Sequence, residues 1–169
     1  MKKLVLAVSL LASANVFATE GGYGGLSIGQ TDYDTDGFDN ATSFAIVAGY
    51  RFSENVAIEG QYLLAGESDD DEPPVWTIDG KALGVTIVGF VPVNDNTEFF
   101  GKVGIASMDV SLDEDGRGEI ASDDETDLTY GVGVKFSNSD SGAFVAEYQI
   151  FDFDGDKVNN ISVGYRFNF

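Results

Sequence analysis

The chain has 169 residues, enough for one domain, and its 29 acidic residues against 9 basic ones give a formal net charge of −20. A surface this acidic argues against nucleic acids and heparin-like polymers as partners. Cysteine and histidine are both absent, which excludes a disulfide framework, histidine-dependent catalytic triads and the commonest metal ligand. The 21 glycines, 13 phenylalanines and 7 tyrosines indicate many short aromatic strands separated by glycine-containing turns.

The beginning of the chain has the pattern of a secretory signal peptide. Two lysines follow the first methionine, an apolar run follows the lysines, and Ala18 ends a small-x-small cleavage pattern. We therefore expect a signal peptide at residues 1–18 and a mature domain at residues 19–169. No later run approaches the ~20 apolar residues that a membrane-spanning helix needs, which leaves an exported soluble domain or a β-barrel.

Eight later segments alternate between apolar and polar residues with the period of two that is typical of β-strands. They lie at residues 21–30, 42–52, 56–64, 77–91, 98–108, 127–136, 144–150 and 161–169. Short turns follow the second, fourth and sixth segments. Acidic connections follow the first, third, fifth and seventh, and the longest of them is expected at residues 109–125.

The last segment shows the alternation most clearly. Small or polar residues separate its large apolar residues, which are Ile161, Val163, Tyr165, Phe167 and Phe169. The facing of residues 77–91 is less evident, and we favour an outer face made of Leu83, Val85, Ile87 and Val91. A strand with one apolar and one polar face suits a membrane barrel, whose outer face contacts lipid and whose inner face lines a polar interior.

The charged residues of the best-patterned segments all fall on the polar face, although the faces are assigned from apolar residues alone. The set is Arg51, Glu59, Lys102, Lys135, Glu147 and Arg166. A lysine or arginine on the lipid face at mid-membrane would cost ~2–4 kcal/mol, whereas an eight-stranded barrel has just enough room to hold such side chains inside. We expect a barrel-interior charge network in which Glu59 and Glu147 neutralise the four cations. The alternative is a charged pore lining.

These patterns predict an all-β fold, an eight-stranded antiparallel up-and-down transmembrane β-barrel. Its strands have about the ~10 residues that a tilted strand needs to cross a bilayer. Because such barrels have short periplasmic turns and longer outer loops, both termini are expected in the periplasm and four acidic loops outside the cell. Aromatic residues near the short turns would form a girdle at the periplasmic interface. The alternative is an aromatic core in a soluble sandwich.

Three segments carry a resemblance to a known family: residues 49–62, 100–104 and 164–169. They are similar to the strand–turn–strand pattern of small outer-membrane barrels of the OmpA, OmpX and Ail-like superfamily, a porin family in the loose sense. The resemblance implies a monomer in a Gram-negative outer membrane, surrounded by lipid and lipopolysaccharide. It also implies that Tyr165, Phe167 and Phe169 form the signal that the barrel-assembly machinery reads. Likeness to Ail would suggest adhesion.

The first acidic connection resembles half of a calcium-binding loop. Asp32, Asp34 and Asp36 precede a glycine at the sixth position, as in an EF-hand, but Ser43 occupies the twelfth position, where a glutamate is needed. We expect at best a weak metal site there for calcium or magnesium. The alternative is a solvated acidic surface without bound cations.

No catalytic and no cofactor-binding residue is predicted, because outer-membrane lipases and proteases rely on histidine and none is present. We therefore expect a non-enzymatic barrel that serves membrane structure or surface interaction through its loops, including adhesion. The alternatives are a small low-conductance channel and divalent-cation binding by the loops at the outer leaflet.

Overall fold

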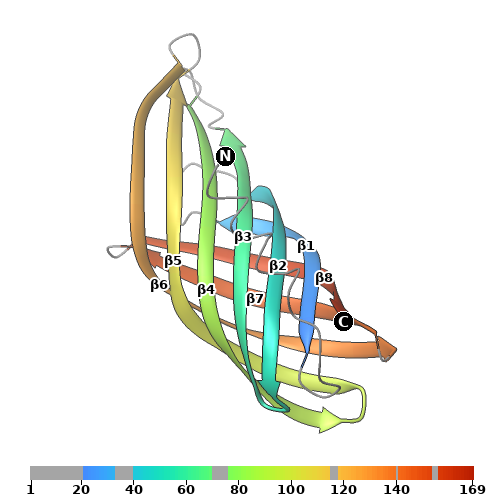
Figure 1. The fold of residues 1–169 in the computed structure, drawn as a ribbon. Coiled ribbons are helices and arrows are strands. Elements are labelled where there is room, and N and C mark those ends of the chain that lie inside the picture. Colours follow the sequence, from blue (N-terminus) through green and yellow to red (C-terminus); the bar gives the residue numbers. More distant parts are fainter. Residues whose placement is uncertain (1–20, 33–39, 70–75, 115–117, 140, 154–155) are drawn as a thin grey trace.

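In the computed structural model the eight strands form one closed barrel, in which each strand pairs with its neighbours in the sequence and β8 pairs with β1 (Figure 1). The structure describes residues 21–32, 40–69, 76–114, 118–139, 141–153 and 156–169. The strands are β1 (Gly22–Asp32), β2 (Ala41–Ser53), β3 (Val56–Asp69), β4 (Trp76–Asn94), β5 (Thr97–Glu114), β6 (Gly118–Ser139), β7 (Gly142–Phe153) and β8 (Asp156–Asn168). The predicted eight-stranded antiparallel barrel is confirmed.

Pairing of the first and last strands closes the sheet. The register runs without interruption from Tyr23 opposite Asn168 to Asp32 opposite Asn159. Beyond it, the backbone N–H of Phe169 donates to the carbonyl of Gly22 at 2.9 Å. A closed sheet has no free edge, so the backbone donors and acceptors along each strand can pair with those of its two neighbours. Among the described residues there is no helix long and apolar enough to cross a membrane.

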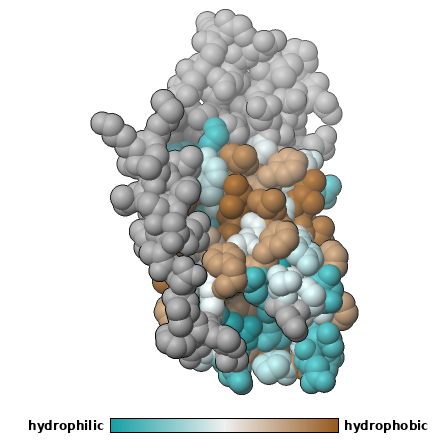
Figure 2. Space-filling model, turned by 45° about the vertical axis from the view of Figure 1, so that its right-hand side comes forward, coloured by the Kyte–Doolittle hydropathy of each residue, from teal (hydrophilic) through white to brown (hydrophobic). Residues whose placement is uncertain are grey.

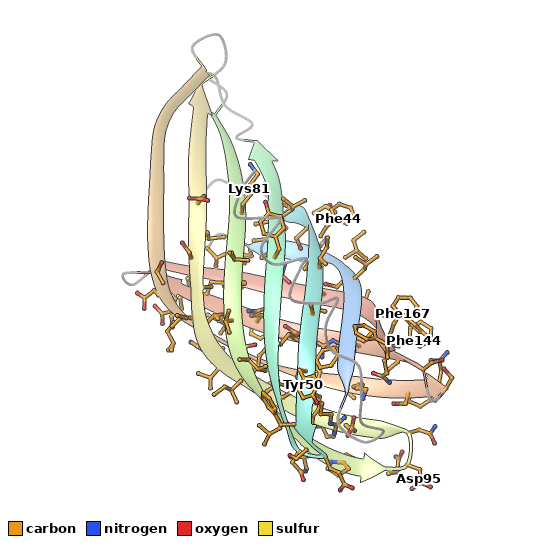
Figure 3. All side chains as sticks on the ribbon, in the orientation of Figure 1. Phe44, Tyr50, Lys81, Asp95, Phe144 and Phe167 are labelled. Atoms are coloured by element: carbon orange, nitrogen blue, oxygen red, sulfur yellow. The ribbon has the colours of Figure 1, made fainter. Side chains whose placement is uncertain are left out.

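The outer face of the barrel is apolar. Large side chains at alternate positions are about half exposed, and these include Leu26, Phe44, Ile87, Val132 and Ile161. On the side of the molecule seen in Figure 2, apolar residues gather across the middle and hydrophilic residues lie below them. In Figure 3, Phe44, Phe144 and Phe167 point away from the barrel, at levels between those of Lys81 and Asp95, and Asp95 lies at the lower end.

The facing favoured for β4 agrees with the structure. Its outward residues Leu83, Val85, Ile87 and Val91 are exposed, whereas Thr86 is 2% exposed.

The prediction of a long loop at residues 109–125 is wrong. Residues 109–114 continue β5, residues 118–125 belong to β6, and the two pair from Asp109 opposite Asp124 to Glu114 opposite Gly118. In the same way, β3 continues to Asp69, which the sequence pattern placed in a connection. Strands β3 to β6 therefore extend past the others at the end of the barrel that carries the acidic connections (Figure 1). Met108, Val110 and Leu112 continue the apolar alternation of β5 among acidic residues, whereas residues 118–125 of β6 show no such alternation.

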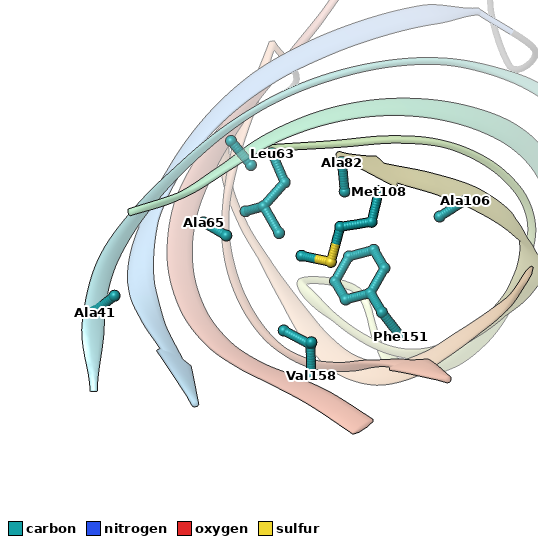
Figure 4. Packing of buried hydrophobic residues seen from close by; sticks show 9 residues of the cluster. Ala41, Leu63, Ala65, Ala82, Ala106, Met108, Phe151 and Val158 are labelled. Carbon is teal, nitrogen blue, oxygen red and sulfur yellow. The ribbon is translucent and has the colours of Figure 1, made fainter. Parts of the chain in front are cut away.

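Two apolar clusters fill the lumen at different heights. The cluster towards the acidic connections, which we call the upper plug, consists of Ala41, Ala45, Leu63, Ala65, Ala82, Ala106, Met108, Phe151 and Val158. Its larger side chains meet across the interior from different strands (Figure 4). The cluster towards the short turns, the lower plug, consists of Tyr23, Ala57, Val88, Phe90, Phe100 and Val145. Polar residues occupy the inner face between the two plugs.

Glycines on β5 differ sharply in the space around them. A Cβ on the inward-facing Gly104 would collide with the carbonyl oxygen of Val85 and lie 2.6 Å from the Cα of Thr86. A Cβ on the outward-facing Gly101 would lie 3.8 Å from its nearest neighbour, the carbonyl oxygen of Gly131. Only the first glycine is therefore required by close approach of the neighbouring backbone.

We predict that Gly104→Ala lowers the free energy of unfolding by about 1–3 kcal/mol, because the strands must separate to admit the methyl group. Gly101→Ala should leave it unchanged or raise it by up to ~1 kcal/mol, since alanine restricts the unfolded chain. Urea titration of the refolded barrel in detergent micelles measures both. Equal urea midpoints for the two variants would contradict the close approach at Gly104.

Candidate functional site in the barrel interior

Four charged side chains from four strands meet between the two plugs and form the central cluster. They are Glu59 of β3, Lys102 of β5, Glu147 of β7 and Arg166 of β8. Lys102 Nζ lies 3.4 Å from Glu59 Oε1 and also contacts Glu147 Oε1. Arg166 Nη2 lies 3.0 Å from Glu59 Oε2 and 3.3 Å from Glu147 Oε2. Each cation thus touches both carboxylates, and the cluster has no net charge.

Neutral side chains add further hydrogen bonds to the central cluster. The hydroxyl of Tyr23 donates to Glu59 Oε2 at 2.9 Å, and Lys102 Nζ donates to Gln61 Oε1 at 2.9 Å. The guanidinium of Arg166 lies 5.4 Å from the ring centre of Tyr23 and 5.2 Å from that of Phe100. Since buried charges are costly unless paired and hydrogen-bonded, these contacts explain how Glu59 is tolerated with no exposed surface.

A second charge cluster, the lower cluster, lies near the short turns. Arg51 of β2 contacts Glu98 of β5 with both terminal nitrogens, at 3.1 Å and 2.7 Å. Lys135 of β6 lies 2.9 Å from the same carboxylate. The guanidinium of Arg51 also lies 4.3 Å from the ring centre of Phe90, which belongs to the lower plug. The paired forks of arginine and carboxylate give this contact a defined geometry.

Uncharged polar side chains on the inner face near the upper plug form hydrogen bonds with one another. Asn160 Nδ2 donates to Thr31 Oγ1 at 2.9 Å and to Ser43 Oγ at 2.7 Å. Gln149 Nε2 donates to Thr129 Oγ1 at 2.8 Å. These bonds join β8 with its neighbour β1 and with β2, and β7 with its neighbour β6.

The structure places all six residues of the expected charge network on the inner face, but it pairs them differently. Glu59 and Glu147 contact Lys102 and Arg166, whereas the cations of the lower cluster contact Glu98. The expected network omitted Glu98. One sequence signal could have found it, because Glu98 has the same strand parity as Lys102. Its position opposite Lys135 becomes visible only in the β5–β6 register. Parity also places Tyr23 inward, where its hydroxyl meets Glu59.

Asp32, the first residue of the expected metal site, lies at the end of β1. Asp34 and Asp36 lie outside the described residues. Within the part of the chain that the structure describes, no group of three acidic side chains could hold a metal ion. The weak calcium or magnesium site therefore stays a prediction.

The residues of the expected assembly signal lie on the outer face at the closing strand. The rings of Tyr165 and Phe167 are 4.8 Å apart, and Phe144 of β7 lies 5.0 Å from Tyr165 (Figure 3). The ring of Phe169 covers Gly22. A Cβ built on Gly22 would lie 2.6 Å from Cε2 and 3.1 Å from Cδ2 of that ring. The terminal phenylalanine thus packs across the seam between β8 and β1.

Comparisons with known proteins agree with this geometry. Residues 4–169 match the family model of the outer membrane protein beta-barrel domain. No curated protein sequence matches the chain.

Among solved structures, Neisserial surface protein A is 14% identical with a TM-score of 0.68, and the match covers 89% of this chain and 97% of that one. The N-terminal barrel domain of Pseudomonas aeruginosa OprF is 12% identical with a TM-score of 0.65, covering 89% and 100%. Ail of Yersinia pestis, solved in complex with the heparin analogue sucrose octasulfate, is 20% identical with a TM-score of 0.60, covering 89% and 97%. At these identities the likeness shows the fold.

Because the family model spans nearly the whole chain, the protein belongs to the outer membrane protein beta-barrel domain family and is an integral protein of the Gram-negative outer membrane.

Proposed function

We propose that this protein is a non-enzymatic, non-conducting barrel that presents acidic loops at the cell surface and serves membrane structure or surface interaction. The observation that carries the proposal is the filled lumen. The central cluster lies between the upper and the lower plug, so that an ion on its way through would meet two apolar layers and a neutral set of paired charges.

Passage through this interior would be costly. The aromatic side chains of the lower plug, Tyr23, Phe90 and Phe100, are 3–5% exposed. Beyond them a permeating ion would have to separate Lys102 or Arg166 from its carboxylates, and breaking a buried ion pair costs ~3–5 kcal/mol. An eight-stranded barrel is narrow enough for its own side chains to fill it. This favours a plugged barrel over a small channel.

The proposed orientation places both termini in the periplasm and the acidic connections outside the cell. Short turns join β2 to β3, β4 to β5 and β6 to β7, and the strands that extend furthest do so at the opposite end. Membrane barrels have short periplasmic turns and longer outer loops, which supports this assignment. The loops would then face lipopolysaccharide, and the barrel-assembly machinery would meet the C-terminal strand from the periplasmic side.

The acidity of the chain limits the classes of ligand that its surface loops could bind. Ail has been solved with a heparin analogue, but a chain with net charge −20 would repel a sulfated sugar unless a local basic patch overcame the field. We therefore infer that surface interaction, if the loops carry it, involves a basic partner or divalent cations. The absence of histidine disfavours hydrolytic activity of the kinds found in outer-membrane lipases and proteases.

Planar-bilayer recording tests the proposal. The purified protein should show no steady openings above those of protein-free bilayers that contain the same detergent, because the two plugs close the lumen. A porin added to the same bilayer serves as the positive control. Steady openings that scale with protein concentration would support the channel alternative instead.

The central cluster should matter strongly for stability. We predict that Lys102→Met lowers the free energy of unfolding by about 3–5 kcal/mol, because it leaves two buried carboxylates beside a single cation. Adding Glu147→Gln should recover part of the loss, because the remaining Glu59–Arg166 pair is balanced. Urea titration in micelles measures each variant.

Lys157→Met is the matched control, since Lys157 is exposed and its removal should change stability by less than ~0.5 kcal/mol. Equal losses at the two lysines would contradict a buried charge cluster as the stabilising centre of the lumen.

The assembly signal can be separated from simple loss of an aromatic ring. Phe169→Ala should reduce the amount of barrel in outer-membrane fractions, whereas Phe44→Ala, which removes a similarly exposed ring from β2, should not. Heat-modifiable migration on SDS gels distinguishes folded from unfolded protein in both strains. If the two variants assemble equally well, the signal interpretation fails.

A further inference from the structure

A small cavity lies inside the barrel wall where β1, β7 and β8 meet. Its volume is about 20 Å³, and its polar lining consists of Ser27, Gln61, Glu147, Ser162 and Arg166. The β1–β8 register explains the space. Inward positions on the two strands are occupied by small residues that face each other, with Ser27 opposite Gly164 and Gly29 opposite Ser162.

The arginine at this cavity is incompletely hydrogen-bonded by the protein. Nη2 of Arg166 makes both contacts to the carboxylates of the central cluster, whereas Nη1 is buried and has no hydrogen-bond partner among the described residues. The whole residue is 5% exposed. A buried N–H without an acceptor is costly, and nearly all such groups in native proteins are paired with protein or with ordered water.

We propose that the cavity is a binding site for one water molecule, which accepts a hydrogen bond from Arg166 Nη1. The volume suits a single water, which needs roughly 10–15 Å³ and two to four polar partners. The hydroxyls of Ser27 and Ser162 and the oxygens of Gln61 and Glu147 line the same space and can serve as the other partners. The water belongs to the central cluster and completes the donor set of its arginine.

Charge favours water over an anion. The central cluster is already neutral, and a carboxylate, Glu147, lines the cavity. A chloride ion would lose its hydration shell and would be attracted only by Arg166, whose charge Glu59 and Glu147 already neutralise. Its net attraction to the site is therefore small. Water, in contrast, can accept from the arginine and donate to a lining oxygen at the same time.

A high-resolution crystal structure of the full barrel tests the site directly. We expect an electron-density peak at roughly 2.7–3.2 Å from Arg166 Nη1 and no anomalous peak after a bromide soak. A bromide peak at that position would overturn the proposal in favour of a halide. An empty cavity, or a protein acceptor for Nη1, would overturn it outright.

Two substitutions of one residue give an independent solution test. Ser27→Val fills the cavity and should displace the water, which lowers the urea midpoint because Nη1 loses its acceptor. Ser27→Ala removes one candidate partner of the water but leaves room for it, so its urea midpoint should fall less than that of the valine variant. If the valine variant is as stable as the alanine variant, the water is not needed and the proposal fails. The crystallographic test remains decisive if the valine variant does not fold.

Discussion

Closure of the sheet by β1 and β8 is the constraint on which the rest of the structure depends. In a bilayer no water can satisfy an exposed backbone N–H or C=O, so a spanning sheet must have no free edge. In a closed barrel, successive side chains of a strand face lipid and the interior in turn. The facing of each position therefore decides which residue types suit it. The closing strands carry small inward residues such as Gly25, Ser27 and Gly164, which leave room for Arg166 to reach the centre. The seam thus also shapes the site at the arginine.

The interior is layered because the same order of residue types recurs on the inner faces of β5 and β7. Inward residues of β5 pass from Phe100 through Lys102 to Ala106 and Met108. Those of β7 pass from Val145 through Glu147 to Phe151. Each of these two strands contributes one apolar residue to the lower plug, one charge to the central cluster and one or two apolar residues to the upper plug. Apolar layers on both sides keep the charges out of bulk water, which strengthens their mutual attraction and makes an unpaired member expensive.

Much of the barrel wall could be predicted from the sequence, because an alternation of apolar and polar residues indicates a strand with one lipid-facing side and one interior side. The eight strands, their outer faces and the inward position of Arg51 or Glu147 follow from parity alone. Pairing between charges does not, because it depends on register: Glu98 faces Lys135 only once β5 and β6 are aligned. The extension of β6 through residues 118–125 was harder to predict, since no apolar alternation marks it, whereas Val110 and Leu112 continue the alternation of β5 into the segment that was expected to be a loop. Side-chain patterns reveal strands that contact lipid, and strands held by backbone bonds alone leave no such pattern.

The two ends of the barrel therefore differ in kind. At the short-turn end the lower cluster of Arg51, Glu98 and Lys135 lies on the inner face of the barrel. At the other end β3 to β6 continue as a paired sheet beyond the remaining strands (Figure 1). Groups carried on paired strands are held more rigidly than groups on loops, and recognition gains from such pre-organisation. A barrel that only filled space in the membrane would not need this extension, which favours surface interaction within the proposed function.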